Sequence, residues 1–363
     1  MTRVRARGED IRRYILGNVE KHPTDIAKVT GDHFGITRQA AGKHLQRLTS
    51  EGALAETGQT KGRSYKLCPL SEWMKAYPRT PELAEDQVWR NDIQQVLGQL
   101  PDNVRDIWHY GFTEMFNNAK DHSDGTEITV RVRKTAVDTN MLLIDNGIGI
   151  FKKIQDALKL LDERHAILEL AKGKLTTDPK NHTGEGIFFA SRMFDPFIIL
   201  SGGAAFSHDY GEKEDWILEP KQPGNGTTVW MRLHNHTART SKKIFDQYSG
   251  GDDYGFNKTV VPVNLARYGN ENLISRSQAK RLLARVELFK IVVFDFSGVE
   301  TIGQAFADEI FRVFANQHPD IQLLTIKANS EVKRMITRAK AGGVEEPPPD
   351  QQSLPGFDPP TSD

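Results

Sequence analysis

The sequence predicts a multidomain protein with a small, mostly helical N-terminal domain, a central α/β sandwich and a smaller α/β C-terminal domain. Its 363 residues exceed one typical domain. Short helical patterns dominate the first 70 residues, whereas helix and strand patterns alternate from about residue 100. After Arg239 this alternation starts again, which indicates a second α/β unit.

The composition is that of a soluble globular protein, with 38% hydrophobic and 26% charged residues. No apolar run approaches the ~20 residues that cross a bilayer. The basic N-terminus lacks the apolar core and cleavage site of a signal peptide. The single cysteine, Cys68, permits no intrachain disulfide and fits a reducing compartment. We therefore expect a cytoplasmic protein with no membrane partner.

The N-terminal domain is expected over residues 1–70. Helical patterns cover residues 4–22, a short segment after Thr24, and a third segment that Thr37 caps and that runs to about Glu51. Two short strands then flank a glycine- and lysine-bearing tip within residues 56–67. A short helix, a glycine turn and a second helix with a polar outer face look like a winged helix-turn-helix.

This resemblance implies that the domain binds double-stranded DNA. The first 70 residues hold 13 Lys and Arg against 7 Asp and Glu, a balance of +6. Arg38, Gln39 and Lys43 share the outer face of the third helix, where their donors match guanine and adenine acceptors. Lys61 and Arg63 at the wing tip suit phosphates. The alternative is a winged helix used only for protein contacts.

Residues 71–100 are expected to form a linker, between Pro69 and Pro81, followed by a helix over residues 82–100. The next helix carries the stretch Thr113–Asp121, in which Glu114, Asn118 and Asp121 share one face at i, i+4, i+7. Two carboxylates and a carboxamide on one stripe can hold a divalent cation and orient a water. A merely solvated helix face is the alternative for these three residues alone.

Three further polar or glycine-rich stations follow in order. They are Asp145-Asn146-Gly147-Ile148-Gly149 after an apolar run, His182-Thr183-Gly184-Glu185-Gly186 before a helix, and Gly224-Asn225-Gly226-Thr227-Thr228 before a strand. Glycines at a helix start let backbone N–H groups approach a phosphate. Further strands around these stations predict an α/β sandwich with a mixed sheet over residues 101–238.

The four stations resemble the N, G1, G2 and G3 boxes of the GHKL (Bergerat-fold) ATP-binding family, over roughly residues 85–235. The resemblance implies an ATP–Mg²⁺ site in which Glu114 activates water and Asn118 binds Mg²⁺. It implies that Asp145 bonds the adenine amino group and that Gly147 and Gly149 shape the adenine pocket. The polar segment 172–181 stands where the family keeps its ATP lid, so Lys174 is a candidate for contacting the β- and γ-phosphates. The remaining expected cofactor-binding residues are Asp121, Thr183, Gly184, Gly186 and Thr227.

The run Val293–Val299 resembles the STAS domain of anti-sigma-factor antagonists, over roughly residues 255–340. In that family an Asp-Ser pair carries the phosphoacceptor serine, but Gly303-Gln304 stands at the matching positions here. The resemblance therefore implies partner binding without phosphorylation. Residues 341–363 hold six prolines, five acids and no base, and are expected to be disordered.

These features favour a cytoplasmic, ATP-responsive DNA-binding regulator in which ATP–Mg²⁺ binding and slow hydrolysis switch the domain arrangement. Such a regulator is compatible with a homodimer. The alternative is a serine/threonine protein kinase that resembles the anti-sigma-factor kinases. A third interpretation is a protein that holds nucleotide without turning it over. A sensor histidine kinase is not expected, because His109 lies one turn from Glu114 on the same helix and cannot meet its own ATP.

Overall fold

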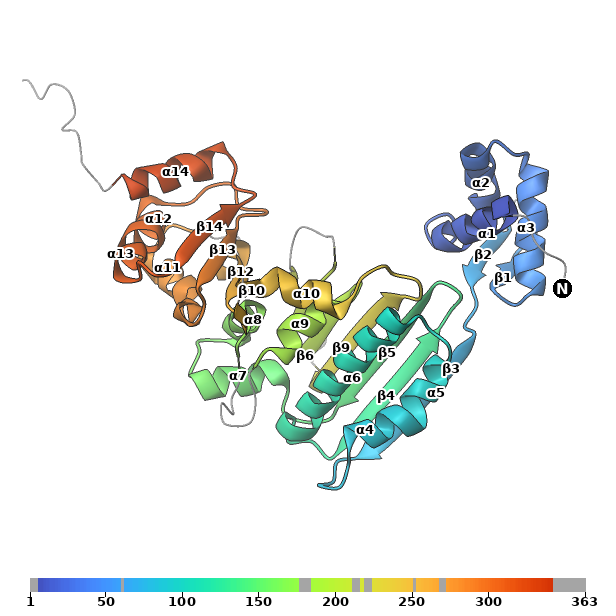
Figure 1. Cartoon of the computed structure of the whole chain (residues 1–363), viewed down its shortest axis with the longest axis horizontal. Helices are drawn as coiled ribbons and strands as arrows, with labels where there is room; N and C mark the ends of the chain where they lie inside the picture. Colours follow the sequence, from blue (N-terminus) through green and yellow to red (C-terminus); the bar gives the residue numbers. More distant parts are fainter. Residues whose placement is uncertain are drawn as a thin grey trace, which may run out of the picture.

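The computed structural model describes residues 6–59, 62–175, 184–210, 216–218, 224–250, 253–267 and 272–341. Three parts follow one another along the chain, with the longest sheet in the middle part (Figure 1). Helices combine with sheets of two, two, three and seven strands, which agrees with a multidomain α/β protein. Within the described ranges, no helix is both long and apolar enough to cross a membrane.

The N-terminal part consists of three helices and a two-stranded antiparallel sheet. Its elements are α1 (Ala6–Asn18), α2 (Ile26–Phe34), α3 (Arg38–Ser50), β1 (Leu54–Thr57) and β2 (Ser64–Leu67). The helix α3 begins where the sequence predicts, because Thr37 Oγ1 accepts a hydrogen bond from the Ala40 N–H at 3.2 Å. This part has a hydrophobic core of its own, against which Ala136 and Val137 of the central part pack.

The central part is a seven-stranded sheet with helices. Its elements are β3 (Ser71–Pro78), α4 (Glu85–Val88), the π-helical segment η2 (Trp89–Ile93), α5 (Gln94–Leu97), α6 (Asp102–His122), β4 (Glu127–Lys134), β5 (Asp138–Asp145), α7 (Ile150–Leu158), α8 (Glu163–Lys172), α9 (Gly186–Ser191), β6 (Phe197–Gly202), β7 (Ala204–His208), β8 (Trp216–Leu218) and β9 (Gly224–His234).

The expected mixed sheet is wrong in one respect, because every described strand pair of this sheet is antiparallel. The strand order is β3-β4-β5-β9-β6-β7-β8. The strands β5 and β6 run in the same direction, because the helical segment that joins them crosses from one end of the sheet to the other. The last strand, β9, then inserts between them and pairs antiparallel with both.

The expected linker at the start of residues 71–100 is also corrected. The strand β3 lies at one edge of the sheet and pairs with β4 along its whole length, from Ser71 opposite Lys134 to Pro78 opposite Glu127. The helix expected after it is present as α4, η2 and α5 in succession. Residues 71–97 therefore belong to the central sheet and its covering layer.

One face of the central sheet is covered by helices, with α6 lying across its middle strands (Figure 1). Along β4, the side chains of Ile128, Val130 and Val132 are fully buried, whereas Arg131 between them is exposed. This alternation has the two-residue period of a strand with one buried face. Phe112 and Phe116 of α6 are also fully buried. The polar side of α6 is consequently held at the covered face of the sheet.

The C-terminal part follows a helix and a short hairpin, α10 (Ser241–Tyr248), β10 (Ser249–Gly250) and β11 (Asp253–Phe256). Its elements are β12 (Lys258–Pro262), η3 (Val263–Ala266), α11 (Arg276–Leu283), η4 (Val286–Leu288), β13 (Ile291–Asp295), α12 (Gln304–Asp308), the π-helical segment η5 (Glu309–Phe314), α13 (Ala315–Gln317), β14 (Gln322–Ile326) and α14 (Ser330–Lys340). Its three strands are parallel in the order β12-β13-β14.

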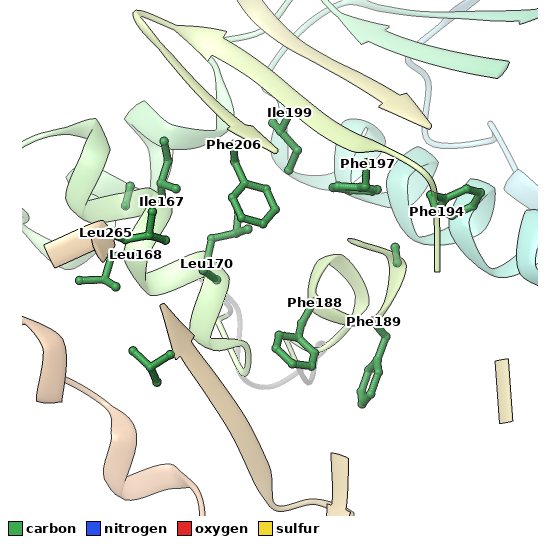
Figure 2. Packing of buried hydrophobic residues seen from close by; sticks show 14 of the residues in the cluster. Ile167, Leu168, Leu170, Phe188, Phe189, Phe194, Phe197, Ile199, Phe206 and Leu265 are labelled. Atoms are coloured by element: carbon green, nitrogen blue, oxygen red, sulfur yellow. The ribbon is translucent and has the colours of Figure 1, made fainter. Parts of the chain in front are cut away.

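The hydrophobic cores of the central and C-terminal parts form one continuous cluster. Ile167 and Leu168 of α8 lie beside Leu265 of η3 (Figure 2). Phe256 of β11 packs against Phe188 and Phe189 of α9, with ring centroids 4.6 and 4.8 Å apart. The helix α8 is thus shared between the central part and the C-terminal part.

Candidate functional site

A cavity of about 300 Å³ lies between α6, α7, the ends of α8 and α9, and the covered face of the sheet. Six of the residues expected to bind cofactor or act in catalysis line it together: Glu114, Asn118, Asp145, Gly184, Gly186 and Thr227. They come from four separate stretches of the sequence. The volume falls at the small end of the range typical of ligand sites.

The polar stripe of α6 faces this cavity, but not through all three expected residues. Glu114 and Asn118 line the cavity, and so does His122, whereas Asp121 is exposed and does not. At about 100° per residue, Asp121 lies about 20° beyond Glu114 and about 60° from Asn118, on the side away from Met115 and Ala119, which also line the cavity. His122, four residues after Asn118, takes the place that we expected for Asp121.

Asp145 is a buried polar group of the site that backbone N–H groups hold in place. Its side chain is 5% exposed, and its Oδ1 accepts hydrogen bonds from the N–H groups of Gly147 (2.9 Å) and Thr227 (3.2 Å). Burial raises the pKa of this carboxyl, and the two backbone N–H groups partly oppose that rise. The Thr227 Oγ1 accepts a hydrogen bond from the Ile150 N–H at 3.0 Å and so fixes the start of α7. The stretches Asp145–Gly149 and Gly224–Thr228 are therefore joined directly.

Gly149 provides the turn from β5 into α7. Its φ of 91° lies in the region that favours glycine, and a Cβ there would come within 2.5 Å of Ser201 Oγ. With Gly147 bonded to Asp145, this turn forms one side of the cavity through Ile150, Lys153 and Ile154.

Gly186 at the start of α9 meets the carboxylate of Glu114. A Cβ at position 186 would overlap that carboxylate. Glycine is required because α9 approaches α6 at this point. Glu114 is therefore held beside the N-terminus of α9. Glu114 and Gly186 also line a second, neighbouring cavity.

Several residues of the cavity were not expected from the sequence. Lys153 lines it and pairs with Asp124, Nζ to Oδ2 at 2.8 Å. An apolar floor comes from inward-facing strand residues and one helix residue: Leu143, Ile199, Val229 and Met115. The two-residue alternation of β5 and β9 indicates which of their side chains face inward. Nothing in the sequence distinguishes the side chains that line the cavity from ordinary core residues.

Lys174 does not line the cavity, contrary to its expected place beside phosphates. Its Nζ donates to the Leu288 carbonyl oxygen at 2.9 Å and lies 4.9 Å from the centroid of the Phe289 ring. Both partners belong to the C-terminal part. Thr183, the remaining expected residue of this segment, lies outside the described residues.

The end of α8 is anchored to the C-terminal part by a buried charge network. Lys172 is fully buried, and its Nζ donates to Glu169 Oε1 (2.7 Å) and to the carbonyl oxygens of Arg281 (3.1 Å) and Ala284 (2.7 Å). Arg285 pairs with the other oxygen of Glu169 at 3.1 Å. Burial lowers the pKa of Lys172, while the carboxylate of Glu169 opposes that change.

This network is linked to the cavity by a few residues of chain. Arg285 also donates to the Lys174 carbonyl oxygen, and Thr259 Oγ1 donates to the Lys172 carbonyl oxygen at 2.6 Å. Leu175, which follows Lys174, lines the cavity. Its N–H donates to the Gly184 carbonyl oxygen at 3.0 Å. The C-terminal part therefore holds one wall of the cavity in place.

The expected DNA-contacting residues of α3 are free to meet a partner. Arg38, Gln39 and Lys43 are exposed. Gln39 and Lys43 point away from the buried Leu45, whereas Arg38 is the first residue of α3 and lies about 20° from Leu45 around the helix. Arg63 forms an ion pair with Glu56 across the β1–β2 hairpin, Nε to Oε1 at 3.3 Å. Lys61 lies outside the described residues.

In the C-terminal part, Gly303 stands at the N-cap of α12 and Gln304 is its first residue. Ser297, the nearest buried hydroxyl, donates from both N and Oγ to Asp295 Oδ1, at 2.9 and 2.7 Å. These bonds assign it to the turn after β13. Across the parts of the chain that the structure describes, no group of three or more His, Cys, Asp or Glu residues could hold a metal ion.

Comparison with known proteins places one part of the chain. A search of curated proteins gives no match. A family model described as a STAS-like domain of unknown function (DUF4325) matches residues 278–333, from α11 to the start of α14. This part of the chain is therefore STAS-like, as the sequence around Val293–Val299 indicated.

Proposed function

We propose that the chain is a cytoplasmic DNA-binding regulator that responds to ATP through a GHKL-type central domain. The observation that carries this proposal is the convergence of Glu114, Asn118, Asp145, Gly184 and Gly186 on one cavity, in the order in which the family's boxes occur.

The chemistry of the cavity supports a purine nucleotide. An apolar floor accepts a planar base, and the buried Asp145 carboxylate can accept from an exocyclic amino group. The N-terminus of α9, with Gly184 and Gly186 beside it, offers N–H groups to phosphates. Lys153 at the rim adds a positive charge.

Mg²⁺ fits the residues present only as a partner of the phosphates. Asn118 and Glu114 supply hard oxygen donors, and Mg²⁺ is commonly held by one or two such side chains together with phosphates and waters. In the proposed reaction Asn118 would hold the ion, which would offset the negative charge of the phosphates. Glu114 orients the attacking water and takes its proton, while the bond from the γ-phosphorus to the bridging oxygen breaks and ADP is the leaving group. Slow hydrolysis to ADP and phosphate resets the switch.

Coupling to a DNA-binding state is supported by the anchored end of α8. Nucleotide in the cavity contacts Leu175. Lys174, the residue just before it, is bonded to Arg285 and Leu288 of the C-terminal part. Nucleotide and the C-terminal part thus act on the same segment, and a protein partner bound to the STAS-like part would act on it too. The exposed basic face of α3, in a winged helix-turn-helix domain, provides the DNA contact.

The test is isothermal titration of the full-length chain with ATP and Mg²⁺, followed by gel shifts of duplex DNA with and without ATP. Binding of ATP together with a nucleotide-dependent DNA affinity supports the proposal. Absence of ATP binding to the wild-type chain refutes it. The alternative, a serine/threonine kinase, requires label from γ-labelled ATP on a partner protein instead of in free phosphate.

A further inference from the structure

The strand β14 lies at one edge of the three-stranded parallel sheet, and among the described strands it pairs with β13 only. The Gln322 N–H and the Ile326 carbonyl oxygen are hydrogen-bonded to the residues that flank β13. Backbone groups of successive residues point to opposite sides of a strand. The N–H and carbonyl groups of Leu323 and Thr325 therefore point away from β13, toward the open edge.

Neither face of β14 is buried, although most of its side chains are apolar. Leu324 is 39% and Ile326 is 38% exposed, and Leu323 on the other face is only partly buried. In the same sheet, Val261 of β12 and Phe294 of β13 are fully buried. Strands of parallel sheets are normally covered on both faces. Among the described strands of this sheet, cover is therefore missing at β14.

The strand β14 also lacks the features by which proteins keep an edge strand from pairing. Its sequence, Gln-Leu-Leu-Thr-Ile, contains no charge and no proline, and its register with β13 is continuous. Two other edge strands have such features. The strand β3 holds Lys75 and Pro78, whereas β12 holds Lys258 and Pro262 and lies against α8. The edge of β14 is thus suited to accept another strand.

We propose that this edge pairs with the β14 edge of a second copy of the chain, antiparallel and centred on Leu324. In this register Leu323 of each copy lies opposite Thr325 of the other copy. These are the residues whose backbone groups point outward, so each such pair can exchange two N–H···O bonds. Leu324 then meets Leu324 of the second copy in a non-hydrogen-bonded pair, where side chains lie closest.

Three features favour a second copy over another occupant. Asp320 precedes the strand and Lys327 follows it, so antiparallel pairing brings unlike charges together, although Lys327 also pairs with Asp295 of its own copy. A two-fold pair uses both β14 edges and is closed, because the opposite edge strand, β12, lies against α8. Residues 342–363 hold six prolines, which lack the N–H of a ladder, so this segment is poorly suited to be the next strand.

Disulfide trapping in a Cys68→Ser chain tests the register. Leu324→Cys should give a covalent dimer on mild oxidation, because the Cα atoms of a non-hydrogen-bonded pair lie ~4.5 Å apart, within the range of a disulfide. Gln322→Cys is the matched control on the same face of β14. Its two copies would lie four residues apart along the strands, about 13 Å, and should not cross-link. Non-reducing gels measure both.

Sedimentation of the full-length chain, without nucleotide or DNA, should show a dimer. Leu324→Lys should weaken it at least about tenfold, since two like charges would face each other. Met74→Lys, at a 68% exposed residue of the edge strand β3, should leave it unchanged. Circular dichroism checks that both variants fold. Because the experiment uses neither ATP nor DNA, failure of the proposed function would leave its result standing.

Three results would overturn the proposal. The first is a chain that stays monomeric over the whole concentration range, and the second is a cross-linking yield that is the same for Leu324→Cys and Gln322→Cys. The third is a full-length monomer that becomes a dimer when residues 342–363 are deleted, because that segment would then be the occupant of the β14 edge. A dimer that persists after this deletion and is lost in Leu324→Lys supports pairing between two copies.

Discussion

Replacing Lys172 by methionine is expected to loosen the contact between α8 and the STAS-like part. The side chain is fully buried and donates to Glu169, Arg281 and Ala284. Methionine keeps most of the volume but leaves the buried carboxylate of Glu169 without this partner. Removing one member of a buried pair typically costs ~3–5 kcal/mol. Because Arg285 still pairs with Glu169 at 3.1 Å, we expect the lower end of that range.

The assay is amide hydrogen exchange over the end of α8 and over residues 281–288. A loss of about 3 kcal/mol in local opening corresponds to roughly a hundredfold faster exchange there. ATP affinity should fall about fivefold or more, since Leu175 forms a wall of the cavity and its neighbours lose their anchor.

Two variants serve as controls. Lys152→Met removes the exposed ion pair with Asp156 and should change stability by less than ~1 kcal/mol. Combining Lys172→Met with Glu169→Gln removes the buried carboxylate that has lost one of its two cationic partners, and should restore part of the protection. The reasoning would be refuted if amide exchange at α8 in both Lys172→Met and Lys152→Met were as slow as in the wild-type chain.

Three further predictions concern the proposed sites. Asp145→Asn should lower ATP affinity about tenfold or more, because a charged acceptor is replaced by a neutral amide; titration calorimetry measures this, and an unaltered affinity would exclude Asp145 from base recognition. Glu114→Gln should bind ATP normally but hydrolyse it ~10²–10⁴-fold more slowly, so wild-type phosphate release would remove it as the base. Arg38→Ala should reduce sequence preference by ~1–3 kcal/mol, whereas Lys61→Ala should weaken all duplexes alike and reduce the salt dependence; gel shifts at several salt concentrations separate the two.

Much of the fold could be predicted because hydrophobic periodicity is a local signal. The helix expected from the Thr37 cap to about Glu51 is present as α3, Arg38–Ser50. The strand β3 was missed because its flanking prolines indicated a linker. Pro78 is tolerated because it is the last residue of an edge strand, where a missing N–H does not break the ladder. The sequence alone does not show whether a strand lies at the edge or in the middle of a sheet.

The candidate site could be predicted in part. Its stations along the chain were visible, but their meeting in one cavity depends on how the sheet is ordered. Asp121 lies outside the lining because the cavity is centred between Asn118 and Ala119, so that Glu114 is at the edge of the lining and Asp121 is about 20° beyond it. Lys174 lies outside the cavity lining, which the sequence does not show, because a lysine in a polar segment suits a phosphate and a carbonyl oxygen equally well. Only the packed C-terminal part decides between them.

The central and C-terminal parts pack together more closely than the sequence pattern indicates. A gap in the sequence pattern near residues 239–255 indicates separate domains, yet Phe256 is 6% exposed and packs against Phe188 and Phe189. Cutting the chain at residue 255 would strip these rings of their cover and remove every partner of Lys172 except Glu169. Regulation by the STAS-like part should therefore be probed with point variants at the α8 contact, since truncation would disturb the cavity itself.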